Sequence, residues 1–369
     1  MGVNSRNFRR FKRILTEDFV IYLRRRGKKP IWTQAYEIAC LYRHHKYIPY
    51  QYLKNSLYLR HPERDIYRYV PTELLHITRD RANSAGDLAL VNDKLLFEET
   101  LRATGLRTTN TLFLLQRNRI RDLGDNIFSY QSFIEAIEAA RLPDGILVKP
   151  TAGGSGSAVF KFHARERALL HDGQPLSEEA FHALVFTTNG GSYWTDFIVQ
   201  ETISQHADIA RLNPTSVNTI RIDTFIDDTG TPHFNAAAIK VGARGSITDN
   251  YGSGGYMIPI DLETGDLSRL AKVDAPFGGH SQDVEELFGP GTSAFAIPFW
   301  QPLREQVILA AQAILPLRAV GWDIAMTPDG PLIVEANADY GIDALQELSG
   351  GYADKPLGLA YIRSRQSQT

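Results

Sequence analysis

Residues 319–341 read Ala-Val-Gly-Trp-Asp-Ile-Ala-Met-Thr-Pro-Asp-Gly-Pro-Leu-Ile-Val-Glu-Ala-Asn-Ala-Asp-Tyr-Gly. Two apolar runs, Val320–Met326 and Pro331–Glu335, flank a Thr-Pro-Asp-Gly segment. A Pro-Asp-Gly turn between two short apolar runs is a strong signal for a β-hairpin. The sequence therefore predicts a β-hairpin over these residues.

Three oxygen donors are expected to meet on the hairpin. Glu335 and Asn337 lie two residues apart, so an extended strand points both to one face, and folding the hairpin brings Asp323 beside them. Such donors suit Mg²⁺ that also binds substrate phosphates. An ordinary hairpin with its acids in solvent is the alternative, but Asp323 has apolar neighbours, where an unpaired carboxylate is costly. The pattern therefore favours a metal site formed by Asp323, Glu335 and Asn337.

Length and composition indicate a soluble globular protein. The chain has 369 residues, 43% of them hydrophobic and 22% charged, which allows two or three subdomains around large cores. The single cysteine, Cys40, excludes disulfides within the chain and argues against a cysteine-based zinc site. The first residues lack the apolar core of a signal peptide, and no apolar run is long enough to span a membrane. We therefore predict a cytoplasmic protein.

Charge is distributed unevenly along the chain. Residues 1–60 contain fourteen Lys and Arg against three acids, although the whole chain has a net charge of −2. A basic N-terminal arm can meet a nucleic acid, an anionic surface or an acidic partner, whereas a solvated helix face is the plainer explanation. No nucleic-acid-binding motif accompanies the charge, so no nucleic-acid partner is predicted.

The first 80 residues are predicted to form a helical module. Apolar residues three or four apart indicate helices over residues 6–27 and Thr33–His45, and a third helix is expected after Pro49. No pattern in this module indicates chemistry of its own.

Two lysines and a small-residue loop follow in the next part of the chain. Lys94 opens a predicted helix that Asp93 caps, and Lys149 ends a predicted strand over residues 145–150. The loop after that strand contains Gly153, Gly154, Ser155 and Gly156. Such a loop lets backbone N–H groups wrap phosphate oxygens while a lysine supplies charge, but a plain flexible turn is the alternative. It is not a Walker loop, because the lysine precedes the glycines and no helix follows directly.

Polar side chains also mark the following strands. The strand over residues 194–202 carries Gln200 and Glu201 near its end, with Ile203 just beyond it. The strand Val217–Phe225 alternates in polarity and carries Arg221 within it.

The next strand, His233–Lys240, ends in Lys240, and the loop after it contains Asn250 among several glycines. Arg221 and Lys240 either pair with an acid such as Asp223 or face a polyanion. A helix over Trp300–Leu317 then leads to the hairpin.

In this order, the two lysines, the small-residue loop, the Gln-Glu-x-Ile strand end, the strand arginine and the acidic hairpin resemble the ATP-grasp superfamily over roughly residues 92–341. The N-terminal module and residues 218–221 and 249–255 look like the ATP-grasp subfamily associated with sugar transfer and polysaccharide gene sets, which is related to the alpha-L-glutamate ligases. The resemblance implies an α+β fold, in which two α+β lobes grip ATP, with a helical N-terminal module.

The resemblance also implies a domain division and residue roles. Residues 1–80 would form the basic helical module, 81–200 the linker, pre-ATP region and small lobe, and 201–369 the large lobe with the metal site. ATP would contact Lys94, Lys149, the loop Gly153–Gly156, Gln200, Glu201 and Ile203, while Asp323, Glu335 and Asn337 would hold Mg²⁺. Arg221, with Lys240 and Asn250, would form the catalytic group.

The activity implied is that of an ATP-dependent carboxylate–amine ligase that acts through an acyl phosphate, with an amino acid joined to a sugar or other small molecule as the suggested product. An ATP-grasp small-molecule or sugar kinase and a non-catalytic scaffold are the alternatives. Analogy with relatives suggests a homodimer. The chain departs from the pattern in its long segment between Gln200 and Arg221, and in Thr219, where relatives often have an acid near the ribose.

Overall fold

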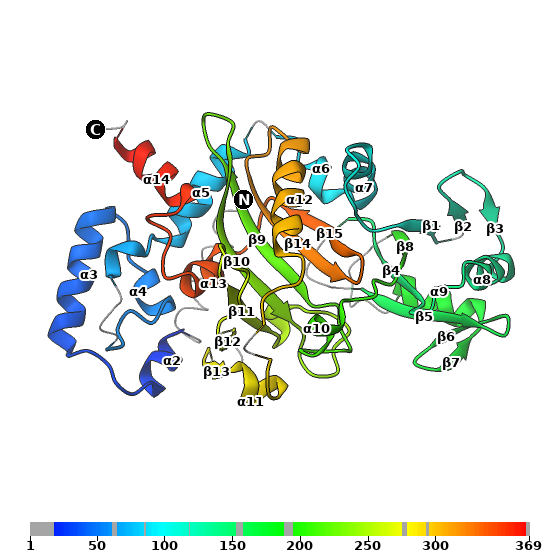
Figure 1. Cartoon of the computed structure of the whole chain (residues 1–369), viewed down its shortest axis with the longest axis horizontal. Coiled ribbons are helices and arrows are strands. Elements are labelled where there is room, and N and C mark those ends of the chain that lie inside the picture. The colour runs from blue at the N-terminus through cyan, green and yellow to red at the C-terminus, as the bar shows by residue number, and fades with distance from the viewer. Residues whose placement is uncertain are drawn as a thin grey trace.

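The computed structural model describes residues 18–60, 65–84, 86–117, 119–152, 158–187, 195–274, 279–292 and 295–366. Two antiparallel sheets dominate this part of the chain, and helices of the N-terminal module lie beside the larger sheet (Figure 1). The expected α+β class is confirmed.

The smaller lobe contains an eight-stranded sheet in the order β3-β2-β1-β8-β4-β5-β6-β7. Its strands are β1 (Thr111–Gln116), β2 (Arg119–Asp122), β3 (Ile127–Phe128), β4 (Ile146–Pro150), β5 (Phe160–Arg165), β6 (Ala168–His171), β7 (Gln174–Leu176) and β8 (Asp196–Glu201). Helices α8 (Tyr130–Ala139) and α9 (Glu178–Thr187) pack on it through a core that includes Phe113, Phe133, Phe162 and Phe181.

The larger sheet has seven strands in the order β13-β12-β11-β10-β9-β14-β15. They are β9 (Thr219–Ile226), β10 (Pro232–Val241), β11 (Tyr256–Ile260), β12 (Leu270–Val273), β13 (Ser281–Asp283), β14 (Ala319–Thr327) and β15 (Gly330–Asn337). The remaining helices are α2 (Phe19–Arg24), α3 (Ile31–His45), α4 (Gln51–Lys54), η2 (Ile66–Arg68), α5 (Thr72–Ala82), α6 (Ala89–Asn92), α7 (Lys94–Ala103), α10 (Ala207–Ala210), η3 (Tyr251–Ser253), α11 (Val284–Phe288), α12 (Trp300–Ala313), α13 (Ile342–Leu348) and α14 (Pro356–Gln366).

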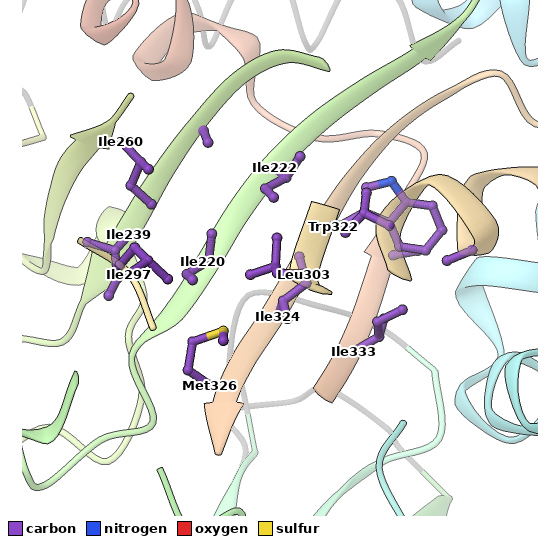
Figure 2. Close-up of a cluster of buried hydrophobic side chains, with 14 of the residues drawn as sticks. Ile220, Ile222, Ile239, Ile260, Ile297, Leu303, Trp322, Ile324, Met326 and Ile333 are labelled. Atoms are coloured by element: carbon purple, nitrogen blue, oxygen red, sulfur yellow. The ribbon is translucent and has the colours of Figure 1, made fainter. Parts of the chain in front are cut away.

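Alternation along the central strands separates a core face from a polar face. Ile222 of β9 and Trp322 of β14 are buried in the cluster that includes Leu303 of α12 (Figure 2). Arg221 and Asp323 occupy intervening positions and are cross-strand partners. Because successive side chains of a strand point to opposite faces, the burial of the apolar set turns this polar pair to the other face of the sheet.

The predicted hairpin is confirmed, and it contains a β-bulge. Its register pairs Ile324 with Ile333 and then Asp323 with Glu335, so the extra residue on β15 is Val334. A bulge bends its strand and changes the direction of the neighbouring side chains. Here Ile333 is buried in the core, while Val334 and Glu335 both line a cavity.

The larger sheet is tied to the segment that leads into β1. Thr108 forms an isolated bridge with Ile333 on β15, and its hydroxyl donates to the Ile333 carbonyl at 2.9 Å. Arg107 accepts from the Ile333 N–H at its own carbonyl and donates to the Asp329 carbonyl at 2.8 Å. These contacts hold the start of the smaller lobe against the edge of the larger sheet.

The C-terminal segment is anchored on the polar face of β9. Asp223, which is fully buried, accepts hydrogen bonds from the hydroxyls of Tyr340 and Tyr352 and from the Asn235 amide at 3.0 Å. Burial raises the pKa of Asp223 to about 6, although these donors favour its ionised form. Gly321 lies opposite Asp223, and a Cβ atom there would lie 2.7 Å from the Tyr340 ring. Glycine at position 321 therefore leaves free the space that the Tyr340 ring occupies.

The N-terminal helices have a small core of their own, formed by Leu41, Tyr52, Leu57, Tyr58 and Tyr69. Helix α3 begins two residues before the predicted start, and α4 is a single short turn after Pro49. The helix predicted over residues 6–27 is described only from residue 18 onward, and α2 ends at Arg24. No helix among the described residues combines the length and the apolar character that crossing a membrane requires.

Other predicted elements differ mainly at their ends. Helix α12 ends at Ala313, four residues before the predicted end, and the strand predicted over 194–202 is shorter. The short strands β2, β3, β6, β7, β12 and β13 were not predicted. The division into residues 1–80, 81–200 and 201–369 stays a prediction.

Candidate active site

A cavity of about 540 Å³ lies between the two sheets. Its lining includes parts of β4 and β8 from the smaller sheet and of β9, β10, β14 and β15 from the larger one. Every predicted site residue that the structure describes lines this cavity: Lys94, Lys149, Gln200, Glu201, Ile203, Arg221, Lys240, Asn250, Asp323, Glu335 and Asn337. Residues predicted from several separate stretches of sequence are thus brought together.

Asp323 is the most enclosed acid of the cavity, with 2% of its side chain exposed. Arg221 binds it in a bidentate manner, from Nε to Oδ1 and from Nη2 to Oδ2, both at 2.8 Å. Lys240 Nζ lies 3.0 Å from Asp323 Oδ1. Burial alone would raise the pKa of Asp323, but the two cations hold it far below its usual range. Asp323 is therefore ionised, and it fixes the positions of Arg221 and Lys240.

Glu335 lies beside Asp323 and has a different electrostatic environment. Burial and the neighbouring Asp323 charge raise the pKa of Glu335, although Lys240 and Lys149 oppose the shift. Asn337 Nδ2 lies 3.2 Å from Glu335 Oε1 and 3.4 Å from Asp323 Oδ2, so the amide stands between the carboxylates. The three side chains therefore lie together, as expected from the predicted hairpin.

This donor set fits a hard divalent cation. Two adjacent carboxylates repel each other in a buried site, and a divalent cation would relieve that repulsion. Rotation of the Asn337 amide would present its oxygen in place of its nitrogen, since the two are alternatives of one planar group. Among the described residues, no group of three or more His, Cys, Asp and Glu is placed so that it could hold a metal ion. The candidate site accordingly consists of two carboxylates and an amide, a set that suits Mg²⁺ when phosphate oxygens complete the coordination.

Two lysines bring positive charge to the smaller-lobe side of the cavity. Lys149 on β4 is 8% exposed, and burial lowers its pKa to about 8, against the attraction of Glu335. Burial also lowers the pKa of Lys94, at the start of α7, and Glu335 again opposes the shift. Asp93 caps α7 by accepting from the backbone N–H groups of its first turn, as predicted. The cavity thus offers two partly desolvated cations, which is the environment in which a polyanion binds strongly.

The Gln200 side chain lies at the cavity lining and is held in a buried hydrogen-bond network. Its amide donates to Glu98 and to the hydroxyls of Thr109 and Thr111, at 3.0 and 3.1 Å for the threonines. Glu98, which is 2% exposed, also accepts from the Thr111 N–H at 3.2 Å. This buried network joins α7 to β1 and β8, and so fixes the helix that carries Lys94.

The remaining predicted residues lie around the same cavity. Glu201 accepts from the Asn110 amide at 2.6 Å, at the end of β8, and Ile203 follows it in the lining. Asn250 caps the short helix η3 by accepting from the Gly252 N–H at 3.0 Å. The loop Gly153–Gly156 lies outside the described residues, so its predicted role stays a prediction.

Asp249 is a site residue that the sequence interpretation did not single out. It accepts from the Thr219 N–H at 2.9 Å and from the Thr219 hydroxyl, and it lies 3.6 Å from Lys240 Nζ. Thr219 had attracted notice because relatives often have an acid there. A carboxylate does lie at this place, but it is that of Asp249, which comes from a distant loop and is hydrogen-bonded to Thr219.

Comparison with known proteins identifies a family for most of the chain. A family model described as "sugar-transfer associated ATP-grasp" matches residues 78–351. No curated protein sequence matches the chain significantly.

Several solved structures resemble the chain distantly. The D-alanine–D-alanine ligase from Coxiella burnetii has a TM-score of 0.40 at 12% identity, over 76% of this chain and 60% of that one. For the D-alanyl-alanine synthetase A from Vibrio cholerae the values are 0.42, 12%, 76% and 66%. For an ADP complex of an N5-carboxyaminoimidazole ribonucleotide synthetase they are 0.39, 12%, 69% and 47%. The chain therefore spans about half to two thirds of the length of these proteins, and likenesses this distant indicate nothing about its substrate.

Proposed function

The chain belongs to the sugar-transfer associated ATP-grasp family, and from that membership we propose that it is an ATP-dependent ligase that joins a carboxylate to an amine. The proposal is carried by one observation. Cationic and acidic residues predicted separately for nucleotide and metal binding line a single cavity between two antiparallel sheets. A scaffold protein would have no need of buried lysines and adjacent buried carboxylates, which are costly to maintain.

We assign the ATP phosphates to the side of the cavity where Lys94 and Lys149 supply positive charge. A magnesium ion bound by Asp323, Glu335 and Asn337 would neutralise part of the phosphate charge. Arg221, held rigidly by Asp323, would stabilise the negative charge that develops on the transferred γ-phosphoryl group. Fixed cations of this kind lower a barrier because they need no rearrangement during the reaction.

The reaction we propose has two steps. A carboxylate oxygen of the substrate attacks the γ-phosphorus, the bond to the β-phosphate oxygen breaks, and ADP and an acyl phosphate form. The amine nitrogen then attacks the acyl carbon, phosphate leaves, the nitrogen gives up a proton, and an amide remains. Because the family is associated with sugar transfer, we extend the proposal to an amide that joins an amino acid to a sugar or another small molecule.

Hydroxylamine tests this proposal, because it is a small amine that captures acyl phosphates as hydroxamates. The protein would be incubated with Mg²⁺–ATP, hydroxylamine and pooled amino acids and sugar acids, and the products would be identified by mass spectrometry. We expect ADP, phosphate and one hydroxamate, whose mass identifies the carboxylate. A phosphorylated acceptor with no free phosphate would instead show a kinase, and absence of ADP with every pool would contradict both activities.

A further inference from the structure

A second group of charged residues lines the same cavity and takes no part in the function proposed above. It includes Lys54 of α4, Lys272 of β12, and Asp343 and Glu347 of α13. In the view of Figure 1, α4 lies to the left of β9 and β10, whereas β4 and β8 lie to their right. Since residues of α4, β4 and β8 all line the cavity, it extends from the lysines of the smaller lobe to the N-terminal module.

The four side chains form two ion pairs across the cavity wall. Asp343 and Glu347 are four residues apart on α13, so they lie on the same face of that helix. Lys54 pairs with Asp343, and Lys272 pairs with Glu347. The side chains are only partly enclosed, at 26% and 27% exposed for the first pair and 11% and 14% for the second.

Asp343 remains ionised in this setting. Burial alone would raise its pKa, but Lys54 lowers it to about 2. The two pairs thus place two cations and two anions in one wall, and the cavity lining also contains the acids Asp18 and Asp274.

The sign pattern restricts the chemistry of a ligand. A polyanion would meet Asp343 and Glu347, and a polycation would meet Lys54 and Lys272. A molecule with one carboxylate and one ammonium group can bond to a lysine and to a carboxylate together, through charge-assisted hydrogen bonds. The neighbouring Leu53 and Ala344 supply apolar surface for a small side chain.

We propose that this part of the cavity binds a zwitterionic substrate, an α-amino acid, between the Lys54–Asp343 and Lys272–Glu347 pairs. The inference rests on the proposed ligase function and assigns a binding site to the amino acid named there. It also gives the N-terminal module a role, because Lys54 lies outside the segment that the family model matches, residues 78–351. The module completes the substrate pocket of the ATP-grasp cavity.

Binding assays on the full chain loaded with Mg²⁺–ADP test this proposal without turnover. Isothermal titration calorimetry would measure the affinity for each common L-amino acid and its D-isomer. For any amino acid that binds, its N-acetyl derivative and its methyl ester each retain only one of the two charges. We expect at least one amino acid to bind at least tenfold more tightly than both derivatives. If the protein binds Mg²⁺–ADP but no free amino acid, the proposal is wrong while nucleotide binding stands.

Variants locate the binding site. Lys54→Met should weaken amino-acid binding at least tenfold and change the affinity for Mg²⁺–ADP less than twofold. The matched control is Lys29→Met, which breaks a pair of similar exposure, Lys29–Glu37 at 2.8 Å, in the same module but outside the cavity lining. Unchanged amino-acid binding by Lys54→Met would overturn the proposal.

A charge swap covers the case in which Lys54→Met does not fold. The double variant Lys54→Asp with Asp343→Lys keeps an attractive pair but exchanges its two ends. We expect it to melt within a few degrees of the wild type and to lose amino-acid binding. Retained wild-type affinity would contradict the proposed site. Loss of Mg²⁺–ADP binding by the wild type itself would instead refute the nucleotide site on which the ligase proposal depends.

Discussion

At the scale of single residues, the neighbouring carboxylates Glu335 and Asp323 differ in their electrostatic environments. Arg221 and Lys240 compensate Asp323, whereas burial and the Asp323 charge raise the pKa of Glu335. We expect Glu335→Ala to lower kcat at least about a hundredfold, as removal of a group that stabilises transition-state charge does. The variant should melt at or slightly above the wild-type temperature, because one of two repelling carboxylates is gone. Glu335→Gln, which keeps the shape of the side chain, is the control, and a large fall in melting temperature for either variant would make Glu335 structural.

Lys149 gives a prediction on pH. Burial lowers its pKa to about 8, so the side chain is a cation below pH 8 and becomes neutral above it. A polyanion binds the cationic form, and affinity for Mg²⁺–ADP should therefore fall as the pH rises through 8, by up to about tenfold per pH unit for one proton. Titrations between pH 7 and 9.5 measure this slope. Lys149→Arg stays charged throughout that range, so an equal slope in this variant would show that another group is responsible.

At the scale of elements, α7 shows how a helix is held so that its first residue faces the cavity. Glu98, on the buried side of α7, accepts hydrogen bonds from Thr109, Thr111 and Gln200, which belong to the segment before β1, to β1 and to β8, respectively. Glu98→Ala would leave these buried donors unsatisfied, so we expect a loss of at least about 2 kcal/mol in the free energy of unfolding. Urea denaturation measures it. Nucleotide affinity should also fall, because the same helix carries Lys94.

The neighbouring residue Glu99 provides the matched control for this helix. It is exposed on α7, and Glu99→Ala should change stability by no more than about 0.5 kcal/mol. Equal effects of the two variants would mean that Glu98 acts through its charge on the helix and not through the buried network.

The predictable elements were those whose signals are local. The β14–β15 hairpin follows from a Pro-Asp-Gly turn between two apolar runs, and the start of α7 follows from its cap, Asp93. The bulge at Val334 has no such signal, because a single extra residue in one strand is decided by pairing with the other. The short strands β2, β3, β6, β7, β12 and β13 were missed for the same reason. They form because neighbouring strands pair with them, and their own sequences carry no strong apolar pattern.

The candidate site was predictable in its residue types but not in its extent. Arg221 and Asp323 were each conspicuous, as charged residues inside apolar strands, and the structure shows them as cross-strand partners. The pair Lys54–Asp343 joins residues 289 positions apart, and neither stands in an unusual sequence context. Contacts between surface-type residues of distant helices depend on how the whole chain folds, so local patterns do not reveal them.

At the scale of the whole molecule, the cavity makes a single ligand-binding region out of two sheets. Because both lobes contribute lining residues, a bound nucleotide should slow local opening on both sides of the cavity. Hydrogen–deuterium exchange with a non-hydrolysable ATP analogue and Mg²⁺ measures this. At a ligand concentration of about 100 times Kd, binding contributes about 2.7 kcal/mol, so amides that exchange only from the unbound open state should slow about a hundredfold. We expect this slowing in β4 and β8 of the smaller sheet and in β9 and β14 of the larger one.

Strand β6, which contributes no described residue to the lining, is the internal control for this measurement. Protection confined to one sheet would contradict a shared site, and protection that Glu335→Ala leaves intact would show that binding and turnover depend on different residues.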